Sequence, residues 1–477
     1  MDGGLPQLLD AAGEAAEILR GWVDEDKYIR VVSHLDADGL AAAGVVGRCL
    51  HRLSASFRIR IERWLDENVI SELASEAPSP IIFADMGSGY LNLIGERLRE
   101  VPIIVVDHHP PVGSPTPNVF QVNPHLHGID GARDISGAGV AYLLAREVDG
   151  RNRDLAYLAV VGALGDLQDK YGDRSLGGVN ELVVRDAVDA GYLRVEKDLL
   201  LYGRETRPVH KALAHTTNPY IPGITGEEDR CLALLVKAGV KLKDGERWRT
   251  ASELTKEERE RVFSLLTEHM LSQGLNVDEA FKLVGAVYVL VREEPWTPLR
   301  DGREFASLLN ACGRMDRAGL GVSICMGDRS NTLKEARETL DEYRRTLMDA
   351  MSWVYGEPGR LEELESVYVI HGGGRISERL VGTVTSLVAS SLPGSRKPVV
   401  AYAFIEGDAA KFSMRLGPGA PAVNLGEVAR VAAERCSGIG GGHDVAAGAQ
   451  VPRERVKDFI SLVNKLVGEA IGDRGEA

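Results

Sequence analysis

Short apolar runs alternate with amphipathic stretches in the first part of the chain. The runs are rich in Val, Ile and Phe, and between them apolar residues recur every three or four positions. Short apolar runs favour strands, and a period near 3.6 favours helices. Apolar strands joined by helices indicate an α/β fold with a doubly wound parallel sheet covered on both faces. The expected strands are Ile29–Ser33, Phe57–Ile61, Pro80–Ala84, Ile103–Val106 and Val119–Val122.

The rest of the chain predicts a helical or mixed middle region and a smaller α/β unit. Helices are expected at 137–149 and 154–165, and a strand at Leu283–Val291. Apolar residues spaced three and four apart from Leu333 to Val354 predict one long amphipathic helix. The expected C-terminal strands are Val367–Ile370, Val399–Phe404 and Lys411–Arg415. We therefore expect three domains, at residues 1–200, 201–355 and 356–477.

Composition sets limits on the class of protein. The 477 residues are too many for one ordinary core. The five cysteines are scattered and form no C-x-x-C pair, which argues against structural zinc or a disulfide framework. The absence of a long apolar run or a basic leader argues against a membrane partner or secretion, so we expect a cytoplasmic protein. A net charge of −14 weighs against a whole-surface nucleic-acid binder, so a polyanion would need a local basic groove and bound cations.

Acidic segments in the first 170 residues are the candidates for chemistry. Each stands where we expect a buried apolar strand to end, and ligands of open α/β sheets bind beyond those ends. Burying several like charges together is costly, and a shared cation is the usual remedy. The segments are Ser33–Gly39 (Ser-His-Leu-Asp-Ala-Asp-Gly), Asp85-Met86-Gly87, Asp107-His108-His109 and Gly165–Asp169.

Taken singly, these residues have simpler explanations as helix caps, turn formers or loop residues. Taken together they favour a metal site. Asp36 and Asp38 are two apart on a segment we expect to be extended, so both can face one point, with His34 on the same side. Gly39 would then let the backbone turn into a helix whose N-terminus favours anions.

The ligand types predict the metal. Carboxylates and imidazoles without thiolate suit Mn²⁺ or Mg²⁺ better than structural zinc. Two such ions roughly 3.5–4 Å apart would stabilise the attacking and leaving oxygens of an in-line phosphoryl displacement. The sequence therefore predicts a two-metal phosphoesterase.

The ordered series of motifs resembles the DHH phosphoesterase superfamily, whose name is its third motif. The resemblance covers the first 170 residues and implies that His34, Asp36 and Asp85 hold one ion. It also implies that Asp38, Asp85, His108 and Asp166 hold the other, with Asp85 bridging. In this family the second histidine of the motif, here His109, contacts the scissile phosphate.

A second set of candidates lies near the C-terminus. Gly438–His443 holds three consecutive glycines, which suit a loop whose backbone N–H groups approach a phosphate. Ser413 and Arg415 are two apart on an expected strand, and an exposed edge-strand arginine is the simpler alternative. The glycine run resembles the GGGH motif of the DHH-associated domain, which marks the nuclease and short-oligonucleotide branch. We expect substrate contacts from Ser413 and Arg415 on the strand and from Gly441, Gly442 and His443 of the glycine run, and His371 is a further candidate.

A finer resemblance narrows the branch. Gly203–Pro208 and Asn218–Gly223 look like the archaeal RecJ-like exonucleases of the GINS-associated type. The resemblance implies a Mn²⁺- or Mg²⁺-dependent exonuclease that releases mononucleotides from single-stranded DNA, with RNA as the alternative. It also implies association with the GINS complex and the replicative helicase in DNA replication or repair. We expect the strand to enter between the N- and C-terminal domains.

Three rival functions stay open at this point. One is a nanoRNase, or a phosphatase acting on very short oligonucleotides or pAp-like nucleotides. Another is a haloacid-dehalogenase-type phosphatase, which Asp36-Ala37-Asp38 imitates but which leaves Asp107-His108-His109 unexplained. The third is a replisome scaffold built on a retired nuclease fold, as in the eukaryotic helicase subunit related to RecJ. The intact acidic residues argue against retirement, because a retired site has no reason to keep mutually repelling carboxylates.

Overall fold

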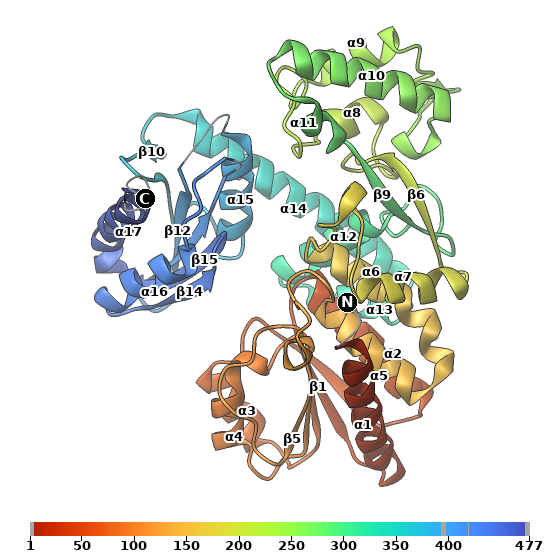
Figure 1. The fold of residues 1–477 in the computed structure, drawn as a ribbon, viewed down its shortest axis with the longest axis vertical. Helices are drawn as coiled ribbons and strands as arrows, with labels where there is room; N and C mark the ends of the chain where they lie inside the picture. The colour runs from red at the N-terminus through yellow and green to blue at the C-terminus, as the bar shows by residue number, and fades with distance from the viewer. Residues whose placement is uncertain (1–3, 393–396, 418, 473–477) are drawn as a thin grey trace. The chain divides into compact units, whose positions relative to one another are not determined.

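Two compact units make up the chain, Met1–Leu340 and Asp341–Ala477. The structure is a computed structural model, and it describes residues 4–392, 397–417 and 419–472 (Figure 1). The three-domain division expected from the sequence stays a prediction.

A five-stranded parallel sheet organises the first unit. The strand order is β2-β1-β3-β4-β5, and every neighbouring pair is parallel. The expected α/β fold is confirmed, and each strand lies within about one residue of its predicted bounds. The strands are β1 (Ile29–His34), β2 (Phe57–Glu62), β3 (Ile81–Ala84), β4 (Ile103–Val106) and β5 (Val119–Val122).

Helices cover both faces of this sheet (Figure 1). On one face α3 (Glu67–Ser75) and α4 (Leu91–Arg97) bury their apolar side chains against β1, β3, β4 and β5. The other face carries α1 (Leu5–Asp24), α2 (Ala37–Arg52) and α5 (Gly137–Val148). This double covering explains why the central strands read as continuous apolar runs.

The remainder of the first unit is largely helical. An antiparallel ribbon of β6 (Leu193–Leu199) and β9 (Val284–Leu290) leads to a helical subdomain with its own buried cluster (Figure 1). That subdomain holds α8 (Val209–Ala214), α9 (Glu228–Lys237), α10 (Lys256–Ser272), α11 (Val277–Phe281) and the short β7 (Lys243–Asp244) and β8 (Arg247–Trp248). The other helices are α6 (Ala156–Gly165), α7 (Asn180–Asp189), α12 (Gly302–Arg314) and α13 (Ala318–Cys325).

The second unit is a six-stranded mixed sheet packed with helices. The predicted long helix is confirmed as α14 (Asn331–Gly356), which leads into this unit. The sheet order is β10-β11-β12-β13-β15-β14. Its strands are β10 (Leu361–Glu363), β11 (Tyr368–Gly373), β12 (Val399–Ile405), β13 (Ala409–Arg415), β14 (Ile439–His443) and β15 (Ala446–Pro452), and its helices are α15 (Val381–Ser391), α16 (Leu425–Arg435) and α17 (Val456–Gly472).

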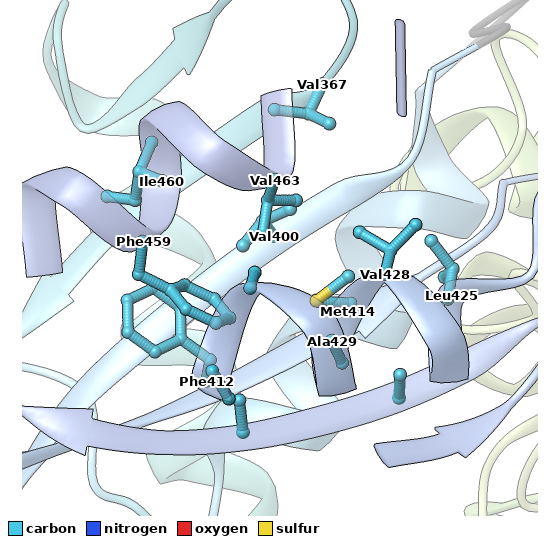
Figure 2. Packing of buried hydrophobic residues seen from close by; sticks show 14 of the residues in the cluster. Val367, Val400, Phe412, Met414, Leu425, Val428, Ala429, Phe459, Ile460 and Val463 are labelled. Atoms are coloured by element: carbon cyan, nitrogen blue, oxygen red, sulfur yellow. The ribbon is translucent and has the colours of Figure 1, made fainter. Parts of the chain in front are cut away.

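The core of the second unit lies between one face of this sheet and helices α16 and α17. Figure 2 shows Phe412 and Met414 of β13 against Phe459 of α17 and Ala429 of α16. The Phe412 and Phe459 rings are 4.3 Å apart between centroids. Because side chains alternate along a strand, the neighbours of Phe412 and Met414 on β13 face the opposite side of the sheet.

The expectation that the glycine run forms a loop is wrong. Residues 439–443 form the edge strand β14, paired antiparallel with β15. A Cβ on Gly440 would lie 2.4 Å from the Ala429 carbonyl oxygen, and one on Gly442 would lie 2.6 Å from the Ala446 carbonyl oxygen. The glycines therefore let the strand approach α16 and β15 closely, which composition alone does not reveal.

Among the described residues, no helix combines the length and apolar character needed to span a bilayer.

Candidate metal centre and phosphate-binding face

The sequence motifs meet at the carboxyl edge of the parallel sheet. His34 ends β1, Asp85 directly follows β3, and His108 comes two residues after β4. Asp166 lies at the C-terminal cap of α6, so the expectation that its segment follows a strand is wrong. The helix expected at 154–165 is confirmed as α6, which is buried on nearly all sides, so its apolar run resembles that of a buried strand.

Three overlapping groups of possible ligand atoms occur there among the described residues. Within each group the ligand atoms lie within 4.8 Å of one another. The groups are His34, Asp36 and Asp85, then Asp38, His108 and Asp166, and finally Asp85, His108 and His109. Asp85 and His108 are shared between groups.

His108 lies at the centre of the cluster. Its Nε2 is 3.3 Å from Asp85 Oδ1, 3.4 Å from Asp166 Oδ2 and 3.8 Å from Asp38 Oδ2. On the other side of Asp85, His34 Nδ1 is 3.8 Å from Asp85 Oδ2. The carboxylate of Asp85 thus faces both histidines, which suits a bridging position between two ions.

Helix termini position the first two aspartates. Asp36 is the N-cap of α2, and its Oδ1 accepts the Gly39 N–H at 3.0 Å. The expectation that residues 36–38 are extended is wrong, because Asp38 lies in the first turn of α2. The Asp36 cap starts that helix at Ala37. Gly39 has no unusual φ, but a Cβ there would lie 2.3 Å from the His34 carbonyl oxygen, so it provides close approach rather than a turn.

The N-terminus of α5 stabilises the charge of Asp38. Its two carboxylate oxygens accept the N–H groups of Gly137 at 2.6 Å and Ala138 at 3.0 Å. The sequence predicts a helix from residue 137 but does not assign these N–H groups to the site. A Cβ on Gly137 would lie 2.3 Å from Asp85 Oδ1, so only glycine leaves room for that carboxylate. Helix N-termini favour anions, so the fully buried Asp38 keeps partners for its charge.

A backbone carbonyl orients His108. Its Nδ1 lies 2.6 Å from the Gly131 carbonyl oxygen. Because a carbonyl only accepts, Nδ1 carries the hydrogen, and the neutral ring presents a lone pair at Nε2. Gln168 Nε2 donates to the same carbonyl at 2.9 Å, which fixes the carbonyl further. This arrangement is typical of histidines that bind metals.

Asp107 has a role that the sequence did not assign. Its Oδ1 accepts from His109 Nδ1 at 2.8 Å, and its Oδ2 accepts the Ser88 N–H at 2.9 Å. Burial raises the pKa of this carboxyl, but the hydrogen bond and charge of His109 outweigh burial and hold the pKa below its usual range. Asp107 therefore positions His109, and its place in the Asp-His-His motif is the signal that pointed to it.

The electrostatics of the cluster favour cations. Burial, followed by the charges of Asp38 and Asp36, raises the pKa of Asp85 well above its usual range. Burial, and then Asp38, raises the pKa of Asp166 to about 7. Burial lowers the pKa of His108, but Asp166 and other carboxylates outweigh it and raise the pKa to about 9. Protons therefore hold the cluster together when no other cation does.

The donor atoms of the cluster fit divalent ions. Asp85 Oδ1 and His108 Nε2 are buried without a hydrogen-bond partner, a costly state for polar atoms. Asp85 also has φ +57°, a left-handed conformation uncommon for a non-glycine residue, and such strain clusters at functional sites. Carboxylate oxygens and imidazole nitrogens are suitable ligands for Mn²⁺ or Mg²⁺.

The C-terminal unit gathers most of the second candidate set on one sheet face. Two rows of paired residues run across β13, β15 and β14. One row is Ser413, Gly448 and Gly441, and the other is Arg415, Ala446 and His443. Paired residues of antiparallel strands face the same side, so all four candidates face away from the core of α16 and α17. Arg415 Nε donates to Ser386 Oγ of α15 at 3.1 Å.

Two other candidates lie elsewhere. Gly442 alternates with Gly441 and so faces α16. His371 hydrogen-bonds Glu362 at 2.8 Å, and its ring contacts Tyr402, which also contacts Phe412. Because Phe412 is on the core side of the sheet, the structure does not bring His371 together with Ser413.

Comparison with protein families gives three matches along the chain. Residues 28–163 match the DHH family, N-terminal domain, residues 201–284 match the DHH-CID domain, and residues 380–469 match the DHHA1 domain. An uncharacterized protein of Methanocaldococcus jannaschii is 33% identical over 454 residues, which cover 93% of this chain and 94% of that protein.

RecJ proteins match over a shorter stretch. The single-stranded-DNA-specific exonuclease RecJ of Thermus thermophilus is 31% identical over 172 residues, 33% of this chain and only 25% of that protein. In fold, RecJ of Thermus thermophilus in complex with Mn²⁺ has a TM-score of 0.60 at 21% identity, over 96% of this chain and 55% of that chain. CDC45 of Entamoeba histolytica has a TM-score of 0.64 at 10% identity, over 96% of this chain and 99% of that one. With its DHH, DHH-CID and DHHA1 domains and its RecJ-like fold, the chain belongs to the DHH family.

Proposed function

We propose that this protein hydrolyses phosphodiester bonds with two divalent ions and acts as an exonuclease on single-stranded nucleic acid. The observation that carries the proposal is the buried pair of unpartnered ligand atoms, Asp85 Oδ1 and His108 Nε2, 3.3 Å apart among further carboxylates. A scaffold that had lost its chemistry would gain stability by replacing such residues.

Each residue then has a task. His34, Asp36 and Asp85 would hold one ion, and Asp38, Asp85, His108 and Asp166 the other. The ions would lower the pKa of a water nucleophile and neutralise charge on the phosphate. His109, held by Asp107, would donate a hydrogen bond to a phosphate oxygen as charge develops there. Ser413, Arg415, Gly441 and His443 would contact substrate phosphates.

The finer parts of the proposal are supported by similarity. The match to the single-stranded-DNA-specific exonuclease RecJ favours single-stranded DNA as substrate, and release of mononucleotides stays a prediction. The presence of Mn²⁺ in the RecJ structure of similar fold supports Mn²⁺ or Mg²⁺ as cofactor. Association with the GINS complex and the replicative helicase stays a prediction. A CDC45-like fold is compatible with a replisome role, and catalysis does not exclude one.

The experiment is timed digestion of 5′- and 3′-labelled DNA and RNA single strands of graded length, in Mn²⁺ and in Mg²⁺. We expect stepwise release of mononucleotides from long single strands and little action on duplex. His108→Ala should remove activity, while His51→Ala, an exposed histidine at the far end of α2, should not. Strong preference for dinucleotides would favour the nanoRNase alternative. Full activity of His108→Ala would contradict the metal centre.

A further inference from the structure

Two exposed aromatic residues lie at the edge of the sheet that carries the metal centre. Trp64 is 39% exposed and Tyr90 is 37% exposed, although aromatic side chains of this size are usually more deeply buried. Trp64 follows β2 and Tyr90 follows β3, the two strands that flank β1. The carboxyl ends of parallel strands lie at one edge, so the segments that carry the two rings leave the sheet at the same edge as His34, which ends β1.

The sheet register limits how far Trp64 can be from the metal centre. Glu62 and His34 are partners in the parallel pairing of β2 with β1. Partners on adjacent strands are about 5 Å apart, and two further residues add at most about 8 Å, so the Cα atoms of Trp64 and His34 lie within about 13 Å. The backbone of Trp64 is therefore close enough to the cluster for a side chain of this length to reach a nucleotide whose phosphate is bound there.

The backbone on both sides of Trp64 is fixed. Leu65 is fully buried, and Asp66 caps α3 by accepting the Val69 N–H at 2.9 Å. The Arg63 guanidinium lies 4.3 Å from the centroid of the Trp64 ring, which restrains the ring and places positive charge beside it. An aromatic ring that is exposed on an anchored backbone is suited to stacking, because little entropy is lost on binding.

Tyr90 belongs to the same surface. It ends the short 3₁₀ helix Ser88–Tyr90, and Leu91 after it is fully buried. Leu65 and Leu91, which follow Trp64 and Tyr90, pack in one buried cluster, so the two segments lie against the same core. Burial, and then the charge of Asp66 just before α3, raises the pKa of Tyr90. The Ser88 N–H is bonded to Asp107, which connects this segment to the Asp-His-His motif.

We propose that Trp64 and Tyr90 form a stacking surface for the bases of the single strand whose phosphate is bound at the metal centre. This rests on the proposed function and deepens it, since it identifies what would distinguish single strands from duplex. Unpaired bases present their faces for stacking, whereas paired bases in a duplex are already stacked on one another.

The test compares a normal DNA single strand with the same strand lacking bases in the nucleotides at both ends. Trp64→Ala should lower kcat/KM on the normal strand by about 10-fold or more, with a smaller loss for Tyr90→Ala. On the abasic strand Trp64→Ala and the wild type should be equal. Trp64→Phe, which keeps a ring, should retain most of the activity.

Trp296→Ala is the matched control. Trp296 is 50% exposed and also carries an arginine, Arg247, 4.6 Å from its ring, but it does not follow a strand of the parallel sheet. This variant should behave as the wild type on both strands. An equal loss for Trp64→Ala on the normal and abasic strands, or no loss on either, would overturn the stacking surface.

A second measurement needs neither hydrolysis nor the alanine variant. Without divalent metal, the normal strand should quench tryptophan fluorescence in the wild type and much less in Trp64→Phe, and the abasic strand should quench neither. Equal quenching of both proteins would contradict the proposal. If the wild type binds strands but cuts none in Mn²⁺ or Mg²⁺, the proposed function fails instead.

Discussion

The two candidate sites of this protein differ in the burial and hydrogen bonding of their charged side chains. At the edge of the parallel sheet, several carboxylates and an imidazole are buried, and Asp85 Oδ1 and His108 Nε2 have no hydrogen-bond partner among the described residues. On the C-terminal sheet, Arg415 already donates to Ser386 and to backbone carbonyls, and His443 is exposed. The clustered carboxylates of the first site repel one another unless protons or metal ions offset their charge, whereas Arg415 of the second site already has hydrogen-bond partners. We infer that the first performs chemistry and the second contributes binding.

The largest effect should come from the bridging carboxylate. Asp85→Asn keeps the shape but removes the charge shared by both ion positions, so hydrolysis should fall by about 1,000-fold or more. Calorimetric titration with Mn²⁺ should show loss of uptake, and circular dichroism should show an intact fold. Near-normal turnover with weakened Mn²⁺ uptake would show that the cluster is not the catalytic site.

The next effect is the pH dependence of metal binding. In the metal-free protein the pKa of Asp166 is raised to about 7 and that of His108 to about 9, so Mn²⁺ must displace protons below these values. The bound protons stabilise the metal-free fold, and this stabilisation is lost as pH rises through about 7 and then about 9. Release of one proton alone predicts about 100-fold tighter Mn²⁺ binding at pH 8 than at pH 6.

Thermal melting with and without Mn²⁺ at pH 6, 7 and 8 measures this dependence. The gain in Tm on adding Mn²⁺ should grow with pH, with Asp85→Asn as the control that shows little gain. A gain independent of pH would mean that metal and protons do not compete for the same atoms.

The C-terminal surface can be tested through two adjacent glycines. Gly440→Ala places a Cβ against the Ala429 carbonyl and should lower the free energy of unfolding by about 1–3 kcal/mol. Gly441→Ala meets no atom within 4 Å and should leave stability almost unchanged. If Gly441 faces substrate, its variant should instead raise KM. Urea unfolding measures the stability of each variant, and steady-state kinetics measures its KM. Equal destabilisation by Gly440→Ala and Gly441→Ala would contradict the assigned faces.

The smallest effect should come from the arginine of that surface. Arg415→Ala should raise KM for single strands by about 10-fold, the usual cost of a lost charged hydrogen bond, and leave kcat and Mn²⁺ uptake nearly unchanged. Arg435→Ala, an exposed arginine on α16, is the matched control. A fall in kcat instead of a rise in KM would show that Arg415 acts on the reacting phosphate.

The local pattern of apolar and polar residues predicted much of the fold. The strands of the parallel sheet are short, apolar and bounded by polar residues, so each was predicted closely. The cluster of carboxylates and imidazoles was predictable because its residues sit in short ordered motifs. Asp38 was misplaced because an extended segment and a helix N-terminus can both follow a strand. Asp107 was missed as a positioning residue because its hydrogen bonds to Ser88 and His109 form only in the folded chain.

The order of apolar and polar residues was enough to determine the parallel sheet, the long helix and the identity of the acidic cluster, since these depend on periodicity and on residue chemistry. Only the tertiary structure decided that the N-terminus of α5 holds Asp38, that the glycine run is an edge strand, and that His371 faces away from Ser413. These features depend on which backbone lies beside which. Packing between segments far apart in the chain determines which backbones are neighbours, and the periodicity of a single segment does not predict that packing.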